Sequence, residues 1–152
     1  MQRSSLTLAE ENARDIKEEL TPLLEASWES IRDDYPFSRL APNFDAYMTL
    51  LDAGMLKLFT ARFDELLIGY ALVILTTHPH REDDVVATVD TIFVQPNFRS
   101  RGTADSLLRF VERTLRALNV CSLVIASRDE RFERWLKFEG YQRAETILER
   151  RL

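Results

Sequence analysis

The chain has 152 residues, of which 45% are hydrophobic and 30% charged, and a formal net charge of −5. This length suits one domain over residues 1–152, and no apolar run is long enough to cross a membrane. The acidic balance argues against nonspecific nucleic-acid binding, which needs cations to neutralise phosphates. The first twenty residues lack the apolar centre of a signal peptide, so a cytoplasmic protein is expected.

Hydrophobic periodicity divides the chain into strand and helix segments. Strands are predicted at residues 6–9, 56–63, 67–76, 85–94, 120–127 and 141–150. Helices are predicted from residue 10 or 11 to residue 31, between the N-cap Asn43 and the stop at Gly54, from the turn at Gly102 to residue 118, and at residues 130–138. Pro22 marks a kink or a break in the first helix. The second and third strands form a hairpin around residues 64–65, and residues 78–84 form a polar connection.

A glycine-bearing turn follows the strand that ends at Val94 and leads into a helix. Its six residues are Arg99, Ser100, Arg101, Gly102, Thr103 and Ala104. The first N–H groups of a helix have no intrahelical partner, and the helix dipole adds positive potential, so such a turn can bind a pyrophosphate. Glycine lets the main chain approach closely, and the two arginines add positive charge. The alternative is an ordinary turn without a ligand.

The turn is neither a P-loop, since GxxxxGK[ST] is absent, nor a dinucleotide fingerprint, since GxGxxG needs three glycines. It resembles motif A of the GNAT superfamily of acyl-CoA-dependent N-acetyltransferases, whose [RQ]xxGx[GA] is matched by Arg99, Gly102 and Ala104. The preceding VDTIFVQPNF resembles the fourth strand of that family, and RWLKFEGY resembles its closing motif, which ends here at Gly140 and Tyr141. The resemblance extends from about residue 56 to the C-terminus.

Pattern alone predicts only an α/β or α+β fold. The resemblance implies a GNAT-like α/β (mixed α+β) fold, with a central mixed, mostly antiparallel sheet of six to seven strands and helices on both faces. In that family the fourth and fifth strands, here residues 85–94 and 120–127, diverge. The pantothenate arm of CoA lies in the gap and binds the backbone like an extra strand. Acetyl-CoA is therefore the implied cosubstrate.

Acetyl transfer to an amine needs a base, a donor that polarises the thioester carbonyl, and a proton for the departing thiolate. Asp90 is the candidate base, because its strand is otherwise rich in apolar residues and a carboxylate partly removed from water binds a proton more readily. A water molecule could carry the proton, because the family often has the longer Glu here. The alternatives for Asp90 are a surface residue and a structural hydrogen-bond acceptor.

The resemblance also implies candidates for the group that polarises the thioester carbonyl and for the group that protonates the thiolate. The carbonyl donor is the backbone N–H of Val94 or of Phe93, at the end of the fourth strand. For the proton donor, many members of the family have a tyrosine four residues before the closing glycine, where this chain has Leu136. Asp129 stands where an asparagine commonly touches the pantetheine, and Phe132 stands where a small alanine often lines the CoA channel. Two other tyrosines are candidate substitutes for the acid: Tyr70 and Tyr141.

Several other residues favour structural interpretations. His78 and His80 lack a third ligand at suitable spacing, so solvated histidines are preferred to a zinc site and no metal is expected. The lone Cys121 stands in an apolar stretch and is expected to be a buried structural thiol. Four late arginines either pair with neighbouring glutamates or reach the 3′-phosphate of CoA: Arg128, Arg131, Arg134 and Arg143.

These observations favour an N-acetyltransferase that moves an acetyl group from acetyl-CoA to a primary amine by direct attack in a ternary complex. The amine belongs to a small molecule or a protein, and residues 30–55 with the connection near His78 are expected to shape its pocket. The alternative is a catalytically degenerate protein that binds CoA or a partner in a structural or regulatory role, and the departures at Asp129, Phe132 and Leu136 favour it. No nucleic-acid or membrane partner is expected, and a homodimer is left open.

Overall fold

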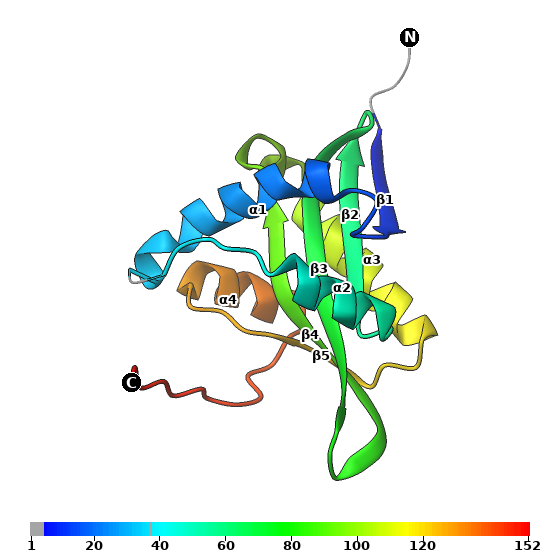
Figure 1. Cartoon of the computed structure of the whole chain (residues 1–152), viewed down its shortest axis with the longest axis vertical. Helices are drawn as coiled ribbons and strands as arrows, with labels where there is room; N and C mark the ends of the chain where they lie inside the picture. The colour runs from blue at the N-terminus through cyan, green and yellow to red at the C-terminus, as the bar shows by residue number, and fades with distance from the viewer. Residues whose placement is uncertain (1–4, 37) are drawn as a thin grey trace.

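One sheet with the strand order β1-β2-β3-β4-β5 organises the chain (Figure 1). The computed structural model describes residues 5–36 and 38–152. Its elements are β1 (Leu6–Glu11), α1 (Lys17–Ile31), η1 (Arg32–Asp34), α2 (Phe44–Asp52), β2 (Leu56–Phe63), β3 (Leu66–His78), β4 (Arg81–Val94), η2 (Pro96–Arg101), α3 (Thr103–Ala117), β5 (Ser122–Ile125) and α4 (Glu130–Phe138).

The sheet is mixed and mostly antiparallel, as predicted. Strands β1 to β4 pair antiparallel, and β5 pairs with β4 in parallel. The described residues form five strands, however, so the predicted six to seven strands are wrong. Residues 141–150 were the expected last strand but form an irregular segment in which Leu148 is 91% exposed. A strand needs a neighbour for its backbone hydrogen bonds, and no described strand pairs with this segment.

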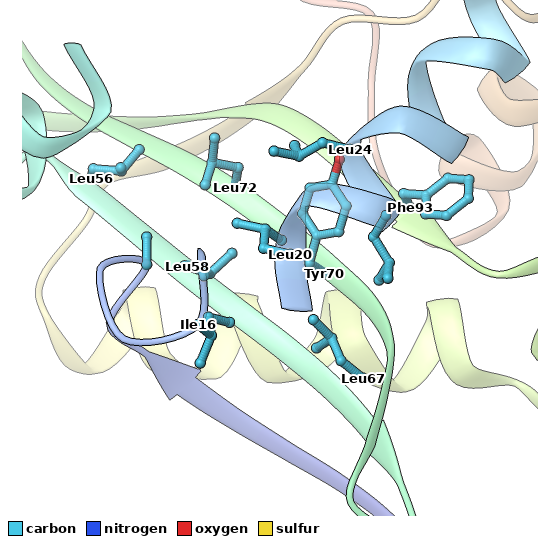
Figure 2. Packing of buried hydrophobic residues seen from close by; sticks show 11 residues of the cluster. Ile16, Leu20, Leu24, Leu56, Leu58, Leu67, Tyr70, Leu72 and Phe93 are labelled. Atoms are coloured by element: carbon cyan, nitrogen blue, oxygen red, sulfur yellow. The ribbon is translucent and has the colours of Figure 1, made fainter. Parts of the chain in front are cut away.

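Each face of the sheet carries its own apolar core. On one face α1 and α2 pack over a cluster that includes Leu20, Leu24, Leu58 and Tyr70 (Figure 2). On the other face α3 packs its apolar stripe against the sheet, and this stripe comprises Leu107, Val111 and Leu115. Alternate residues of a strand point to opposite faces, so β2, β3 and β4 contribute side chains to both cores.

Local signals set the ends of α2. The Asn43 side chain accepts a hydrogen bond from the Ala46 N–H at 3.0 Å, which confirms the predicted N-cap. Gly54 follows the helix at a φ of +71°. The start predicted for the first helix is wrong, because β1 runs on to Glu11 in register with Leu58 and α1 begins only at Lys17. Helix α1 continues through Pro22, so the proline does not break it.

Two hairpins connect the central strands. Asp64 and Glu65 both have positive φ, which suits the tight β2–β3 turn. The β3–β4 hairpin is longer than predicted, since β3 reaches His78 and β4 begins at Arg81. In the described residues, no helix has both the length and the apolar character that a membrane crossing requires.

A charged cluster joins β1, β2 and α1. The Arg62 guanidinium on β2 bonds Glu11 at 3.0 and 3.1 Å and Glu19 at 2.7 and 3.1 Å. The buried Thr60 hydroxyl also donates to Glu11. Burial alone would raise the pKa of Glu11, but the hydrogen bonds from Arg62 and Thr60 outweigh it and the pKa is lowered. The cluster therefore stabilises the folded chain while Glu11 is ionised.

Candidate active site

Strand β4 has an open edge over its second half. Strand β5 pairs with β4 only from Val86 to Val89, where Val89 lies opposite Ile125. Beyond this point β4 continues to Val94, whereas β5 ends at Ile125 and the chain turns into α4 (Figure 1). Backbone groups of β4 that face this side have no described strand beside them. Such an edge can bind an extended ligand as an added strand.

A β-bulge lies at the start of this open edge. Thr91 pairs with Leu72 and Val89 pairs with Val73, so Asp90 is the extra residue. The bulge shifts the alternation of side chains. Val89 packs in the core under α3, whereas Phe93, an even number of residues further on, packs in the core under α1.

The Asp90 side chain is exposed, and it accepts a hydrogen bond from the Thr91 hydroxyl at 3.2 Å. The expectation that the strand partly removes this carboxylate from water is therefore wrong. The reason is the bulge, which takes Asp90 out of the regular ladder that the apolar sequence around it suggested.

Two phenols lie on the same side of the sheet as Asp90. Burial and, to a lesser extent, the charge of Asp90 raise the pKa of Tyr47 on α2. Burial also raises the pKa of Tyr70 to about 12, with smaller contributions from Tyr47 and Asp90, and nearby Ser27 offsets this only in part. Tyr70 is 0% exposed, and its hydroxyl points towards α1 (Figure 2) and is buried without a hydrogen-bond partner among the described groups. No motif in the sequence singled out Tyr47.

At the end of β4 the backbone of Val94 faces the open edge. The Gln95 N–H donates to the Ile68 carbonyl of β3 at 2.8 Å, and the Val94 carbonyl accepts from Arg99 Nε at 2.7 Å. Consecutive residues of a strand direct their N–H and C=O groups to opposite edges. The Val94 N–H therefore points away from β3 into the opening, whereas the Phe93 N–H points towards β3. Both side chains are buried.

The predicted phosphate loop connects this strand end to α3. Gly102 has a φ of +70° and precedes the helix, whose first backbone bond runs from the Ser106 N–H to the Gly102 carbonyl at 3.0 Å. The N–H groups of Thr103, Ala104 and Asp105 therefore have no acceptor within the helix. A Cβ added to Gly102 would meet no atom within 4 Å. The loop thus has unpaired amides beside open space, which fits a diphosphate.

The side chains of the loop are partly engaged in the fold. The Arg99 guanidinium lies over the Phe93 ring at 5.4 Å. Arg101 stacks over the rings of Phe63 and Phe98 at 5.0 and 5.7 Å. The Thr103 hydroxyl is buried and donates to the Phe98 carbonyl at 3.0 Å. Ser100 is exposed and Ala104 is half-buried, so the backbone remains the main donor of this loop.

A comparison with models of protein families gives a match over most of the chain. Residues 16–138 match the model of the acetyltransferase (GNAT) family. The chain belongs to this family. Members of the GNAT family are acetyltransferases that use acetyl-CoA, so the protein is an enzyme of the acetyltransferase class. No curated protein sequence matches the chain significantly.

Solved structures show the same fold. A ribosomal-protein-alanine N-acetyltransferase from Brucella melitensis biovar Abortus 2308 has 21% identity and a TM-score of 0.72, and the match covers 96% of this chain and 99% of that one. The aminoglycoside N-acetyltransferase AAC(6′)-Iy in complex with CoA has 21% identity and a TM-score of 0.75, with 99% and 97% covered. The aminoglycoside acetyltransferase meta-AAC0020, from an uncultured soil metagenomic sample and in complex with sisomicin, has 15% identity and a TM-score of 0.74, with 97% and 96% covered.

The positions where the chain departs from the GNAT pattern lie on α4 and at its N-cap. The Asp129 carboxylate caps this helix by accepting from the N–H groups of Arg131 and Phe132 at 2.8 and 3.4 Å. Leu136 is buried, and Phe132 stacks on Trp135 with ring centroids 5.5 Å apart. Asp129 therefore has a structural role whether or not it also contacts CoA.

The remaining candidate residues lie apart from the opening or are already paired. The Tyr141 hydroxyl donates to Glu112 of α3 at 2.7 Å, and burial followed by this carboxylate raises the pKa of Tyr141. Cys121 is exposed, with its thiol 2.9 Å from the Val85 carbonyl, so the expected buried thiol is wrong because the residue precedes the short β5. His78 and His80 are exposed at the β3–β4 hairpin. The described residues include no cluster of three or more metal-binding side chains.

Proposed function

We propose that the protein transfers an acetyl group from acetyl-CoA to a primary amine of a small molecule or protein, by direct attack in a ternary complex. The observation that carries this proposal is that the connection between β4 and α3 has backbone donors at both ends, the Val94 N–H at the open edge of β4 and the unpaired amides after Gly102. The amides after Gly102 suit the diphosphate of CoA, and the Val94 N–H suits the thioester carbonyl.

Each group has a role that follows from its position. The amides of Thr103, Ala104 and Asp105 bind the diphosphate at the start of α3, where the helix dipole favours negative charge. The Val94 N–H donates to the thioester carbonyl oxygen and stabilises the negative charge that develops there. The bond from Arg99 to the Val94 carbonyl and the burial of the Val94 side chain hold this peptide in place.

Asp90 receives the proton of the acceptor amine through water. Its carboxylate lies on the face covered by α1 and α2, and it can also attract the ammonium form of the acceptor. Tyr70 is poorly suited to protonate the departing thiolate, because burial raises its pKa to about 12 and its hydroxyl lies beneath α1 (Figure 2). Acceptors of the related enzymes, such as aminoglycosides, support an amine as the substrate class.

Turnover of acetyl-CoA with a panel of primary amines tests the proposal, with thiol release as the readout. We expect turnover in the wild type and a loss of at least about a hundredfold in kcat for Asp90→Asn, the lower range for removing a general base. Asp15→Asn, in the exposed turn before α1, is the matched control and should retain wild-type rates. CoA binding without turnover of any amine would instead favour the degenerate, partner-binding alternative, which the buried Leu136 and the capping role of Asp129 support.

A further inference from the structure

Arg128 is held by aromatic groups on the far side of the opening. It lies between β5 and α4, and its guanidinium stands 4.8 Å above the ring of Tyr35, which belongs to the α1–α2 connection. Tyr35 in turn stacks on Trp28 of α1, with ring centroids 5.7 Å apart. A guanidinium stacked on an aromatic face is held in a fixed orientation while its edge N–H groups stay available to an anion.

The edge of the Arg128 guanidinium already binds a carboxylate. Arg128 Nη2 lies 2.7 Å from Glu149 Oε2. Glu149 belongs to the irregular segment after Gly140, where the neighbouring Ile147 and Leu148 are 74% and 91% exposed. The ion pair itself is about half exposed on the arginine side, so it contributes little to stability. A soluble carboxylate can therefore compete with Glu149 for Arg128.

The position of Arg128 suits contact with the acceptor. Val89 and Ile125 are register partners, Asp90 follows Val89, and Arg128 lies three residues beyond Ile125. Chain geometry therefore limits the separation between the Cα atoms of Asp90 and Arg128 to at most about 20 Å, across the side of the opening that α1 covers. The lengths of the Asp90 and Arg128 side chains reduce the distance that a ligand has to span. An acceptor whose amine lies near Asp90 can thus extend towards Arg128.

We propose that Arg128 binds a carboxylate of the acceptor, so that the preferred acceptors are primary amines that also carry a carboxylate, as amino acids do. Glu149 occupies this anion site until the acceptor displaces it. The inference rests on the proposed acetyl transfer and specifies its substrate class. The negative charge of Asp34 also reaches Arg128, so an incoming carboxylate competes with it as well as with Glu149.

Matched pairs of acceptors test the proposal. Linear ω-amino acids of increasing length are each compared with their primary amides, at low ionic strength and saturating acetyl-CoA. At the best length, we expect kcat/KM for the acid to exceed that for the amide by up to about fivefold, the upper end of the range for a partly exposed ion pair. Arg128→Met should reduce this ratio to about one, and Glu149→Gln should raise it. Arg131→Met, on the neighbouring exposed turn of α4, is the control and should leave the ratio unchanged.

Two results would overturn the inference while leaving acetyl transfer intact. One is equal use of acids and amides at every length, and the other is an acid preference that survives in Arg128→Met. A raised KM for acetyl-CoA in Arg128→Met with the preference retained would show that the arginine serves the cosubstrate, which also contradicts the inference.

A direct binding measurement separates this inference from the proposed function. Trp28 fluorescence is followed in a Trp135→Phe background during titration with the same amino acids, because Trp28 stacks on Tyr35 beneath Arg128. A response that disappears in Arg128→Met would support the carboxylate site even if no amine is turned over. If the wild type neither turns over any amine nor shows an Arg128-dependent response, both the site and the proposed function fail.

Discussion

Gly102 offers a change that separates CoA binding from backbone strain. Its φ is +70°, and an added Cβ would meet no atom within 4 Å, so Gly102→Ala is expected to fold. The left-handed backbone costs an alanine about 1 to 2 kcal/mol, which lowers the Tm of a domain of this size by roughly 2 to 8 °C. The methyl group also occupies space beside the amides of the loop. Loss of one charge-assisted hydrogen bond to phosphate costs about 1.5 to 3 kcal/mol, so CoA binding should weaken between about tenfold and a hundredfold.

Gly54→Ala is the matched control for this change. Gly54 has a φ of +71° and equally open surroundings, but it follows α2 rather than the phosphate loop. Both variants should show a similar loss of Tm by thermal unfolding, and only Gly102→Ala should lose CoA affinity by calorimetric titration. If the two variants bind CoA with the same Kd, the loop after β4 does not hold the diphosphate and the reasoning is refuted.

Three further predictions concern single side chains. Tyr70→Phe removes a buried hydroxyl without a described partner, so the Tm should stay level or rise and turnover should persist; a large loss of kcat would instead assign Tyr70 to the chemistry. Because folding lowers the pKa of Glu11, its stabilising contribution is complete above its ordinary value of 4.5 and is lost as the pH falls through the folded value. The unfolding free energy from urea denaturation should therefore fall less with decreasing pH in Arg62→Met than in the wild type. An equal dependence on pH in the two proteins would show that the cluster does not stabilise the fold. Asn43→Ala should lower the unfolding free energy by about 1 kcal/mol, whereas an unchanged urea midpoint would mean that the cap contributes nothing.

Elements whose signals lie within a short stretch of sequence were predicted well. The bounds of α4 agree with the predicted residues 130–138, and those of β2 agree with residues 56–63. The Asn43 cap and the turn at Gly102 depend on the conformation of one residue and its nearest neighbours, so the sequence contains the whole signal. The apolar stripe of α3 was equally legible, because three buried leucines and a valine recur at helical spacing.

Features that depend on contacts between different elements were not predicted from the pattern. The register shift at Asp90 arises where β4 meets β3, and nothing in the sequence of β4 alone distinguishes a bulge from a regular strand. The last predicted strand had suitable alternation, but it lacks a described neighbour. The sequence left two roles open for Arg128, pairing with a glutamate or contact with the 3′-phosphate of CoA. It could not decide between them because the partners Tyr35 and Glu149 lie far from Arg128 along the chain.

The separation of Asp90 and Val94 along β4 bears on how a proton would leave the acceptor. Four residues of extended strand span about 13 Å. An acceptor nitrogen attacking a carbonyl held at the Val94 N–H lies only a few ångströms from that amide, so the short Asp90 side chain does not reach it directly. Under the proposed function, ordered water between the acceptor and Asp90 therefore has to carry the proton. The bulge favours such an arrangement, because it places Asp90 and the Thr91 hydroxyl side by side at an exposed position where water can be held.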